Sequence, residues 1–125
     1  MKREILFKGK QVDSGEWFFG SLITGKSPLI VCNENGYEYA VHPETVCQFT
    51  GLLDKNGNKI FEGDKVESEK TFYSTNEAVV KWLEKRCGFY FIADTVGTDV
   101  INRNPFQSAY KLNSFKVEIN GNIHD

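Results

Sequence analysis

The fold of this chain is decided by residues 47–64, CQFTGLLDKNGNKIFEGD. Residues 47–50 alternate in side-chain type as a strand does, and Asn56-Gly57 follows at the tip of a turn. A type I′ turn favours Asn-Gly because both central residues need positive φ angles, so residues 59–61 are expected to return as a second strand. Gly63 stands where a bulge or sharp bend starts the next strand, as at the corners of small barrels.

The same signals recur on both sides of this hairpin. Gly15 and Gly36 lie in turn-like segments, and each separates two short apolar stretches. No stretch of twelve or more residues keeps the spacing of a helix, and only a short helical turn after Pro43 is expected. Residues 94–109 show no clear period and are predicted to form a loop. Further strands are expected at residues 5–10, 16–23, 29–32, 37–41, 78–82, 89–93 and 114–119.

These patterns predict a mostly β fold with one domain over residues 1–125. The expected form is a small SH3-like barrel or a related β-barrel with extra hairpins and at most short helical turns. Adjacent rings such as Phe18-Phe19 and Phe89-Tyr90 place one ring on each face of a strand, so some aromatic side chains would be exposed in a monomer. A contact between subunits would bury them, and the sequence therefore predicts a homo-oligomer. The expected interior consists of Phe7, Trp17, Phe19, Leu22, Ile30, Tyr39, Val41, Phe49, Phe61, Val66, Val80, Trp82, Phe89, Phe91, Val117 and Ile119.

Composition excludes several classes of protein. A chain of 125 residues and 14.2 kDa is the size of one domain. Its hydrophobic fraction of 40% and aromatic fraction of 14% are too high for a disordered chain. Lys and Arg number 15 and Asp and Glu number 17, and the resulting charge of −2 excludes a broadly basic nucleic-acid binder.

The cysteines and the N-terminal residues indicate the compartment. Cys32, Cys47 and Cys87 form no C-x-x-C pair, and an odd number of separated cysteines is typical of reduced cytosolic thiols. Only three consecutive apolar residues, Ile5 to Phe7, precede Lys8, whereas the apolar region of a secretory signal needs roughly 7–15. The apolar runs are also far shorter than the roughly 20 residues of a membrane span. The chain is therefore expected to stay in the cytoplasm.

No metal or cofactor site is expected. Asp54, Asn56 and Asn58 have the spacing of the first ligands of an EF-hand, but Lys59 replaces the required Gly and Lys65 replaces the bidentate Glu. The three cysteines and two histidines lack the paired spacing of a zinc site.

Two pairs of residues have side chains of catalytic types, but the position of each pair gives only weak support for catalysis. His42 lies five residues from Cys47, a spacing that does not bring a base to a thiol on an extended chain. Glu62 and Asp64 would share a face of a regular strand, as a carboxylate pair in a hydrolase does, but Gly63 interrupts the strand. Acidic turn residues are the simpler interpretation, so the chain is not expected to be an enzyme.

Local nucleic-acid binding stays open as an alternative. Small barrels stack single-stranded bases on aromatic rings beside Lys and Arg. Core packing accounts for most of the rings in this chain without a ligand. The rings and cations available for such a surface are Trp17, Phe19, Tyr37, Tyr39 and Trp82 with Lys8, Lys10, Lys26 and Lys81.

The sequence resembles the YopX-like phage protein family. The matching segments are residues 16–23, EWFFGSLI, and residues 41–64, which include PET, QFTGL, DKNG and IFEGD. Residues 79–82, VVKW, followed by Gly88-Phe89, and the final GNIHD extend the match. The resemblance implies a small β-rich, barrel-containing protein of phages and prophages that acts in the host cytoplasm, and it transfers no catalytic residue.

These observations together predict a phage or prophage binding or assembly module without enzymatic activity or cofactor. Its partner is expected to be a host or phage protein, in addition to copies of itself, and no membrane is expected to take part. Single-stranded nucleic acid is the alternative ligand. By resemblance, the expected partner surface consists of Trp17, Glu44, Gln48 and Asp64, although Trp17 can instead be core and Asp64 can instead satisfy a turn.

Overall fold

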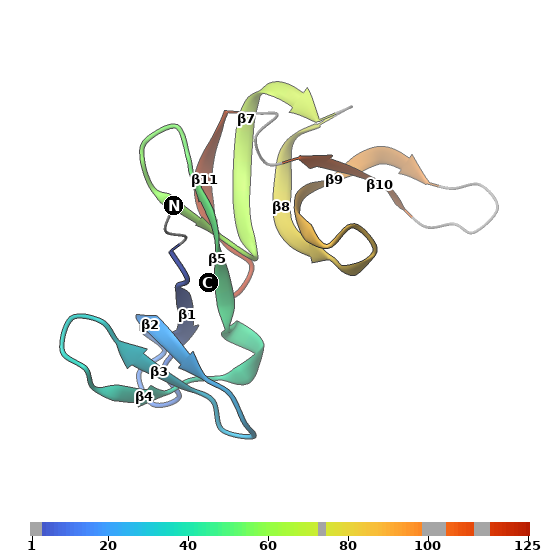
Figure 1. Cartoon of the computed structure of the whole chain (residues 1–125). Coiled ribbons are helices and arrows are strands. Elements are labelled where there is room, and N and C mark those ends of the chain that lie inside the picture. The colour runs from blue at the N-terminus through green and yellow to red at the C-terminus, as the bar shows by residue number, and fades with distance from the viewer. Residues whose placement is uncertain (1–3, 73–74, 99–104, 112–115) are drawn as a thin grey trace. The chain divides into compact units, whose positions relative to one another are not determined.

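The computed structural model describes residues 4–72, 75–98, 105–111 and 116–125, and the predicted mostly β fold is confirmed (Figure 1). For residues 69–72, 75–76, 94–98 and 105–111 it describes only the backbone. Two short 3₁₀ turns, Pro43–Thr45 and Glu84–Arg86, are the helical elements of this described part, and the first confirms the turn expected after Pro43. The strands are β1 (Phe7–Lys10), β2 (Trp17–Ile23), β3 (Leu29–Cys32), β4 (Glu38–Ala40), β5 (Cys47–Leu53), β6 (Lys59–Phe61), β7 (Asp64–Phe72), β8 (Thr75–Leu83), β9 (Gly88–Thr98), β10 (Pro105–Lys111) and β11 (Val117–Asn122).

The chain divides into two compact units, Met1–Gly51 and Leu52–Asp125. The sequence predicted a single domain over residues 1–125, and the division into two compact units does not test whether they fold as one domain, so this stays a prediction. In the first unit the strands form an antiparallel sheet in the order β4-β3-β2-β1-β5. Gly15 and Gly36 have φ angles of 70° and 73°, which confirms the predicted turns between β1 and β2 and between β3 and β4.

Side chains from one face of this sheet fill the interior of the first unit. Ile30 and Val41 are buried. Val41 packs against the backbone of Gly9, where the β-carbon of any larger residue would lie only 3.0 Å from side-chain atoms of Val41. Phe18 stacks on Tyr39 with ring centroids 3.9 Å apart. This packing fixes which face of β2 looks inward.

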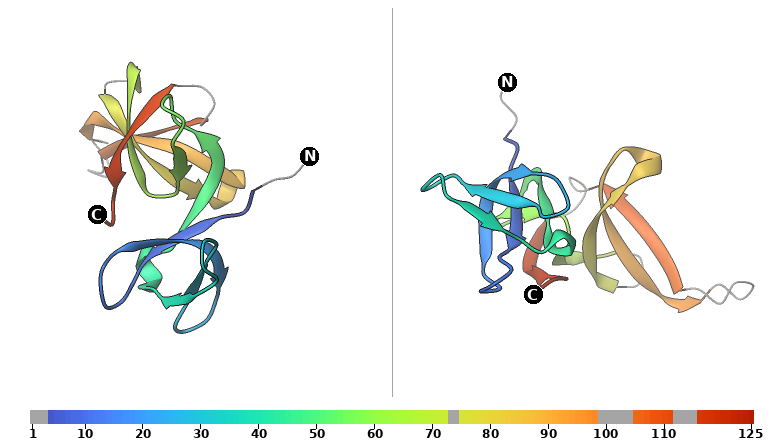
Figure 2. Two further views of the ribbon diagram at one scale, coloured as in Figure 1. Left: turned by 90° about the vertical axis from the view of Figure 1, so that its left-hand side faces the viewer. Right: turned by 90° about the horizontal axis from the view of Figure 1, so that it is seen from below.

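The second unit contains an antiparallel sheet in the order β10-β9-β8-β7-β11. Figures 1 and 2 show β9 and β10 running side by side as a long antiparallel pair. Gly57, with a φ angle of 85°, forms the predicted turn between β5 and β6, and Gly63, at 83°, forms the predicted bend before β7. The core of this unit consists of Ile60, Val66, Ala78, Val80, Phe91, Ala93 and Val117.

Three expectations from the sequence need correction or stay open. The loop predicted over residues 94–109 is wrong for residues 94–98 and 105–109, which belong to β9 and β10, while residues 99–104 lie outside the described part. Phe19 and Trp82, placed in the interior by strand alternation, are each 45% exposed. The SH3-like barrel is not confirmed, because each sheet has an open order of strands among the described residues.

Candidate binding surface

The register of β1 and β2 gathers two lysines and two aromatic rings on one face of the first sheet. Lys8 lies opposite Phe19, and Lys10 lies opposite Trp17. Directly opposed residues of an antiparallel pair project from the same face, so these four side chains share a face. We name this set, Lys8, Lys10, Trp17 and Phe19, the cation–aromatic face.

The two ammonium groups lie above the Trp17 ring. Lys8 Nζ is 4.4 Å from the Trp17 ring centroid and 5.9 Å from that of Phe19, and Lys10 Nζ is 5.4 Å from the Trp17 centroid. These distances are within the range of cation–π attraction. Lys8 is only 9% exposed, whereas Phe19 is 45% exposed. The face therefore combines positive charge with accessible ring surface.

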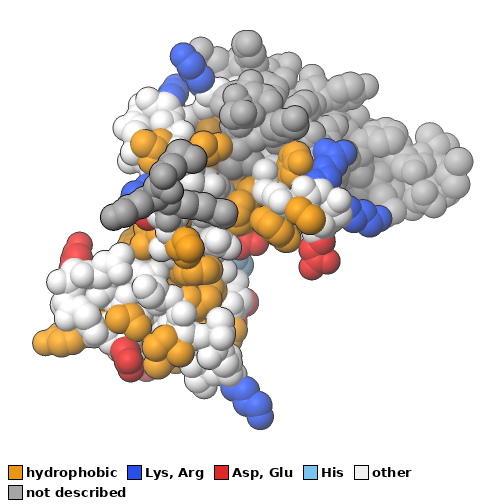
Figure 3. Space-filling view, in the orientation of Figure 1, with side chains coloured by type: hydrophobic (Ala, Val, Ile, Leu, Met, Phe, Trp, Pro, Cys, Tyr) orange, Lys and Arg blue, Asp and Glu red, His pale blue; other side chains and the backbone are white. Residues whose placement is uncertain are grey.

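Apolar side chains continue this face along the sheet. Ile23 lies four residues after Phe19 on β2 and therefore projects from the same face. It is 44% exposed and lies opposite the half-buried Leu29. Figure 3 shows hydrophobic side chains exposed among polar ones on the first unit. Exposed apolar surface beside ordered cations is typical of an interaction site rather than of an inert surface.

The structure separates the four residues predicted as a partner surface. Trp17 is half-buried on the cation–aromatic face. Gln48 lies opposite Phe7, so it projects from the other face of the same sheet. Glu44 lies in the 3₁₀ turn with its side chain exposed, and its Oε1 is 3.8 Å from Nδ1 of His42. Trp17 and Gln48 therefore cannot contribute to one flat contact on this sheet.

Asp64 is a buried residue, and its place in a partner surface stays a prediction. It is 2% exposed in the second unit, where its Oδ2 accepts a 2.8 Å hydrogen bond from the backbone N–H of Phe61. Its Oδ1 accepts a 3.0 Å bond from Nδ2 of Asn122, which also donates to the carbonyl of Glu62 at 3.2 Å. The carboxylate thus holds the bend at Gly63, which agrees with the turn role considered from the sequence and disfavours a Glu62–Asp64 hydrolase site.

Asp54 has a similar structural role in the turn between β5 and β6. Its Oδ1 accepts backbone N–H bonds from Asn56 at 2.9 Å and from Asn58 at 2.8 Å, and its Oδ2 accepts one from Ile119 at 3.2 Å. The resemblance to an EF-hand therefore reflects a turn that is fastened to β11 by amide donors. Among the described residues, no group of three or more His, Cys, Asp or Glu side chains could hold a metal ion.

The hydrogen bonds to Asp54 predict a dependence of stability on pH. Burial by itself raises the pKa of Asp54, but the N–H donors of Asn58, Ile119 and Asn56 outweigh burial and bring the pKa below the ordinary value of 3.8. A lowered pKa in the folded state gives stability that is complete above the unfolded-state pKa and is lost as the pH falls through the folded-state pKa.

The measurement is urea unfolding of the native chain and of Asp54→Asn from neutral pH down to about pH 3. We expect the native chain to be the more stable at neutral pH, and the difference in unfolding free energy to shrink as the pH falls. A difference that stays constant with pH would show that the ionised form of Asp54 has no special role. Asp13→Asn, at an exposed turn position, is the matched control and is expected to show little change.

The other catalytic candidate is also explained by the fold. Cys47 is 1% exposed, and its Sγ donates to the carbonyl of Thr45 at 3.2 Å. His42 instead lies near Glu44. The thiol is thus held inside the first unit as a packing group and is not presented to a substrate.

The rings and cations considered for nucleic-acid binding fall into separate places. Trp17 and Phe19 share the cation–aromatic face with two of the lysines. Tyr39 stacks on Phe18 on the opposite face of the sheet, and Tyr37 is 67% exposed in the turn before β4. Trp82 belongs to the second unit. The sequence named the right residue types, but only the register of β1 and β2 shows which of them meet.

Comparison with known proteins identifies the family. No curated protein matches the chain. None of the helices in the described part of the chain is long and apolar enough to cross a membrane. The family model for the YopX protein matches residues 20–125, which is most of the chain. The chain therefore belongs to the YopX family, as its sequence motifs indicated.

Proposed function

We propose that this chain is a non-enzymatic binding protein that recognises an anionic partner through the cation–aromatic face. The observation that carries the proposal is the placement of the Lys8 and Lys10 ammonium groups over Trp17 beside the exposed ring of Phe19. Aromatic residues in a partly exposed cluster supply contact area at low entropic cost, and ordered cations select negative groups. The first candidate partner is a host or phage protein with an acidic surface.

Catalysis receives no support from the residues that could perform it. Asp64 accepts two structural hydrogen bonds, Asp54 accepts three backbone bonds, and the Cys47 thiol is buried. Each group has a sufficient explanation in the fold. This favours binding over a reaction.

Single-stranded nucleic acid is the second candidate ligand for the same face. Phosphates would meet Lys8 and Lys10, and a base would stack on Phe19, as on the small barrels that bind single strands. The overall charge of −2 favours a local contact of a few phosphates rather than a long track. Membership of the YopX family supports a phage or prophage source, with the host cytoplasm as the site of action.

Tryptophan fluorescence provides the test, because Trp17 and Trp82 are the only two tryptophans of the chain. The Trp82→Phe variant leaves Trp17 as the sole reporter on the cation–aromatic face. Titration with an acidic peptide and, separately, with single-stranded oligothymidylate is expected to change Trp17 fluorescence with one of them. Addition of Lys10→Gln should weaken that binding by about tenfold, which corresponds to ~1.4 kcal/mol.

The control is Lys26→Gln, which removes an exposed lysine of the same unit outside the face. It should leave the affinity within about twofold of the parent. A response to the acidic peptide alone supports the protein partner, and a response to the oligonucleotide alone supports the second candidate. No response to either at low ionic strength, where charge attraction is strongest, would contradict both.

A further inference from the structure

Three aliphatic side chains continue the cation–aromatic face across β2 and β3. Ile23 projects from this face, and Leu29 lies opposite it on β3. Val31, two residues after Leu29 on the same strand, lies opposite Ser21 and therefore projects from the same face. Ile23 is 44% exposed, and Leu29 and Val31 are half-buried. We name Ile23, Leu29 and Val31 the aliphatic patch.

Lys10 places a positive charge at the end of the face away from this patch. It lies opposite Trp17, which is six residues before Ile23 on β2, or about 20 Å along a strand. Its ammonium group lies 5.4 Å from the Trp17 ring centroid, and no carboxylate of the described residues forms an ion pair with it. A negative group of a partner can therefore approach Lys10 without displacing an internal ion pair. Lys8 is 9% exposed, so Lys10 is the more accessible of the two cations.

An acidic residue flanks the aliphatic patch. Glu38 of β4 lies opposite Val31, and its side chain is exposed. An acidic group of a partner is repelled at Glu38 and attracted at Lys10. The charges on this face therefore confine the acidic groups of a partner to the end at Lys10 and leave its apolar groups for the patch.

We propose that the partner is a protein segment with acidic residues at one end and aliphatic residues at the other, a proposal that rests on the proposed function. The acidic residues lie over Lys10, and the aliphatic residues lie over Ile23 and the rest of the aliphatic patch. Removal of both sets of aliphatic side chains from water stabilises the complex. The charge at Lys10 fixes the orientation of the segment on the face.

The aliphatic patch favours a protein segment over single-stranded nucleic acid. Bases stack on aromatic rings or on Arg, and the patch contributes neither. A nucleic acid would contact only Lys10 and the ring of Phe19, and the patch would stay in water. Exposed apolar surface with a polar rim is instead typical of contacts between proteins.

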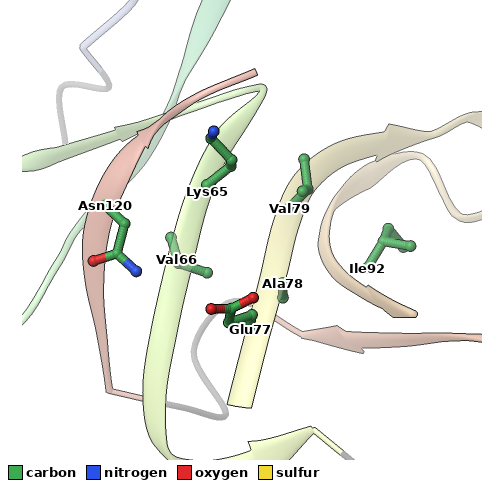
Figure 4. Close-up of a pocket in the computed structure, with 7 residues that line it drawn as sticks. All are labelled: Lys65, Val66, Glu77, Ala78, Val79, Ile92 and Asn120. Carbon is green, nitrogen blue, oxygen red and sulfur yellow. The ribbon is translucent and has the colours of Figure 1, made fainter. Parts of the chain in front are cut away.

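A pocket in the second unit indicates no comparable class of ligand. It has a volume of about 420 Å³ and is lined by side chains of β7, β8, β9 and β11 (Figure 4). Lys65 and Glu77 both line it, so side chains of opposite charge border the same space. This lining selects neither a cation nor an anion. The first unit instead combines one accessible cation with a separate aliphatic patch, which together specify one kind of partner.

Two peptides test the proposal on the Trp82→Phe chain, in which Trp17 reports binding. One peptide carries Asp residues at one end and Leu residues at the other, and in the matched peptide Ser replaces each Leu. The Leu peptide is expected to bind about tenfold more tightly than the Ser peptide, because only the Leu peptide buries the aliphatic patch. Addition of Ile23→Gln should remove this advantage and leave the affinity for the Ser peptide within about twofold.

Ile123→Gln is the matched control, because Ile123 is an isoleucine of the second unit that is 50% exposed. It should leave the advantage of the Leu peptide intact. Equal affinities for the two peptides would overturn the inference and leave the proposed function standing. An equal loss of affinity in the Ile23→Gln and Ile123→Gln variants would do the same.

Two other outcomes would identify a different occupant and overturn the inference. Binding of oligothymidylate but of neither peptide would assign the face to nucleic acid. Trp17 emission that changes with the concentration of the chain alone, and no longer does so in Ile23→Gln, would assign the patch to a second copy. No binding of either peptide or of oligothymidylate at low ionic strength would contradict the proposed function together with the inference.

Discussion

Asp64→Ala is expected to lower the free energy of unfolding by about 2–4 kcal/mol. The substitution removes both acceptors at the bend before β7, and it leaves the N–H of Phe61 and the amide of Asn122 without this partner. Asp64 is 2% exposed and Asn122 is also 2% exposed, so water does not readily replace the lost bonds. Urea unfolding followed by circular dichroism measures the change.

A double-mutant cycle separates the hydrogen bond from the loss of the turn. Asn122→Ala alone is expected to be destabilising, because Asn122 Nδ2 also donates to the carbonyl of Glu62. The double variant should be less destabilised than the sum of the two single variants by about 0.5–3 kcal/mol, as for residues in one network. Additive effects would show that Asp64 and Asn122 act independently. Glu44→Ala, at an exposed position outside this network, serves as the control and should change stability by no more than about 0.5 kcal/mol.

Phe91→Ala is expected to cost about 3–5 kcal/mol. Phe91 is 0% exposed and belongs to the core cluster of the second unit with Val80 and Val117. Truncation to Ala removes buried apolar surface and leaves a cavity that its neighbours fill only in part. Chemical denaturation of the purified variant gives the change in stability, and the variant is expected to fold less completely at elevated temperature.

Phe19→Ala is the matched control for this substitution. The same side chain is removed, but Phe19 is 45% exposed on the cation–aromatic face. The expected cost is about 1 kcal/mol or less, because little apolar surface returns to water. Equal costs at the two positions would contradict the assignment of Phe91 to the core and of Phe19 to the surface. Reduced ligand binding by the stable Phe19→Ala variant would support the proposed function.

Local signals in the sequence predicted the turns and most of the strands. Gly36 before β4, Gly57 between β5 and β6, and Gly63 before β7 each have a positive φ, so the predicted turns are present. The type I′ form expected for Asn-Gly is wrong, because neither Asn35 nor Asn56 has the positive φ that it requires. These features depend on a few neighbouring residues, so one sequence is sufficient to identify them. The loop prediction over residues 94–109 failed because the strands there are defined by pairing between distant segments, β9 with β8 on one side and with β10 on the other. The sequence of residues 94–109 itself shows no simple alternation.

The candidate site was only partly visible in the sequence. Trp17 and its lysines were named as residue types that could bind a ligand, but their assembly depends on the opposition of Lys8 to Phe19 and of Lys10 to Trp17. Asn122 carried no signal, because its bond to Asp64 joins residues 58 positions apart.

The sequence by itself determined a β-rich chain of the YopX family and the places where the backbone reverses, because turn conformation and family motifs are properties of short segments. Only the tertiary structure decided which face of each strand is buried. Side chains alternate between the two faces of a strand, and the alternation alone does not say which face is buried. Phe91 is buried and Phe19 is exposed because of what packs against each face in the folded chain.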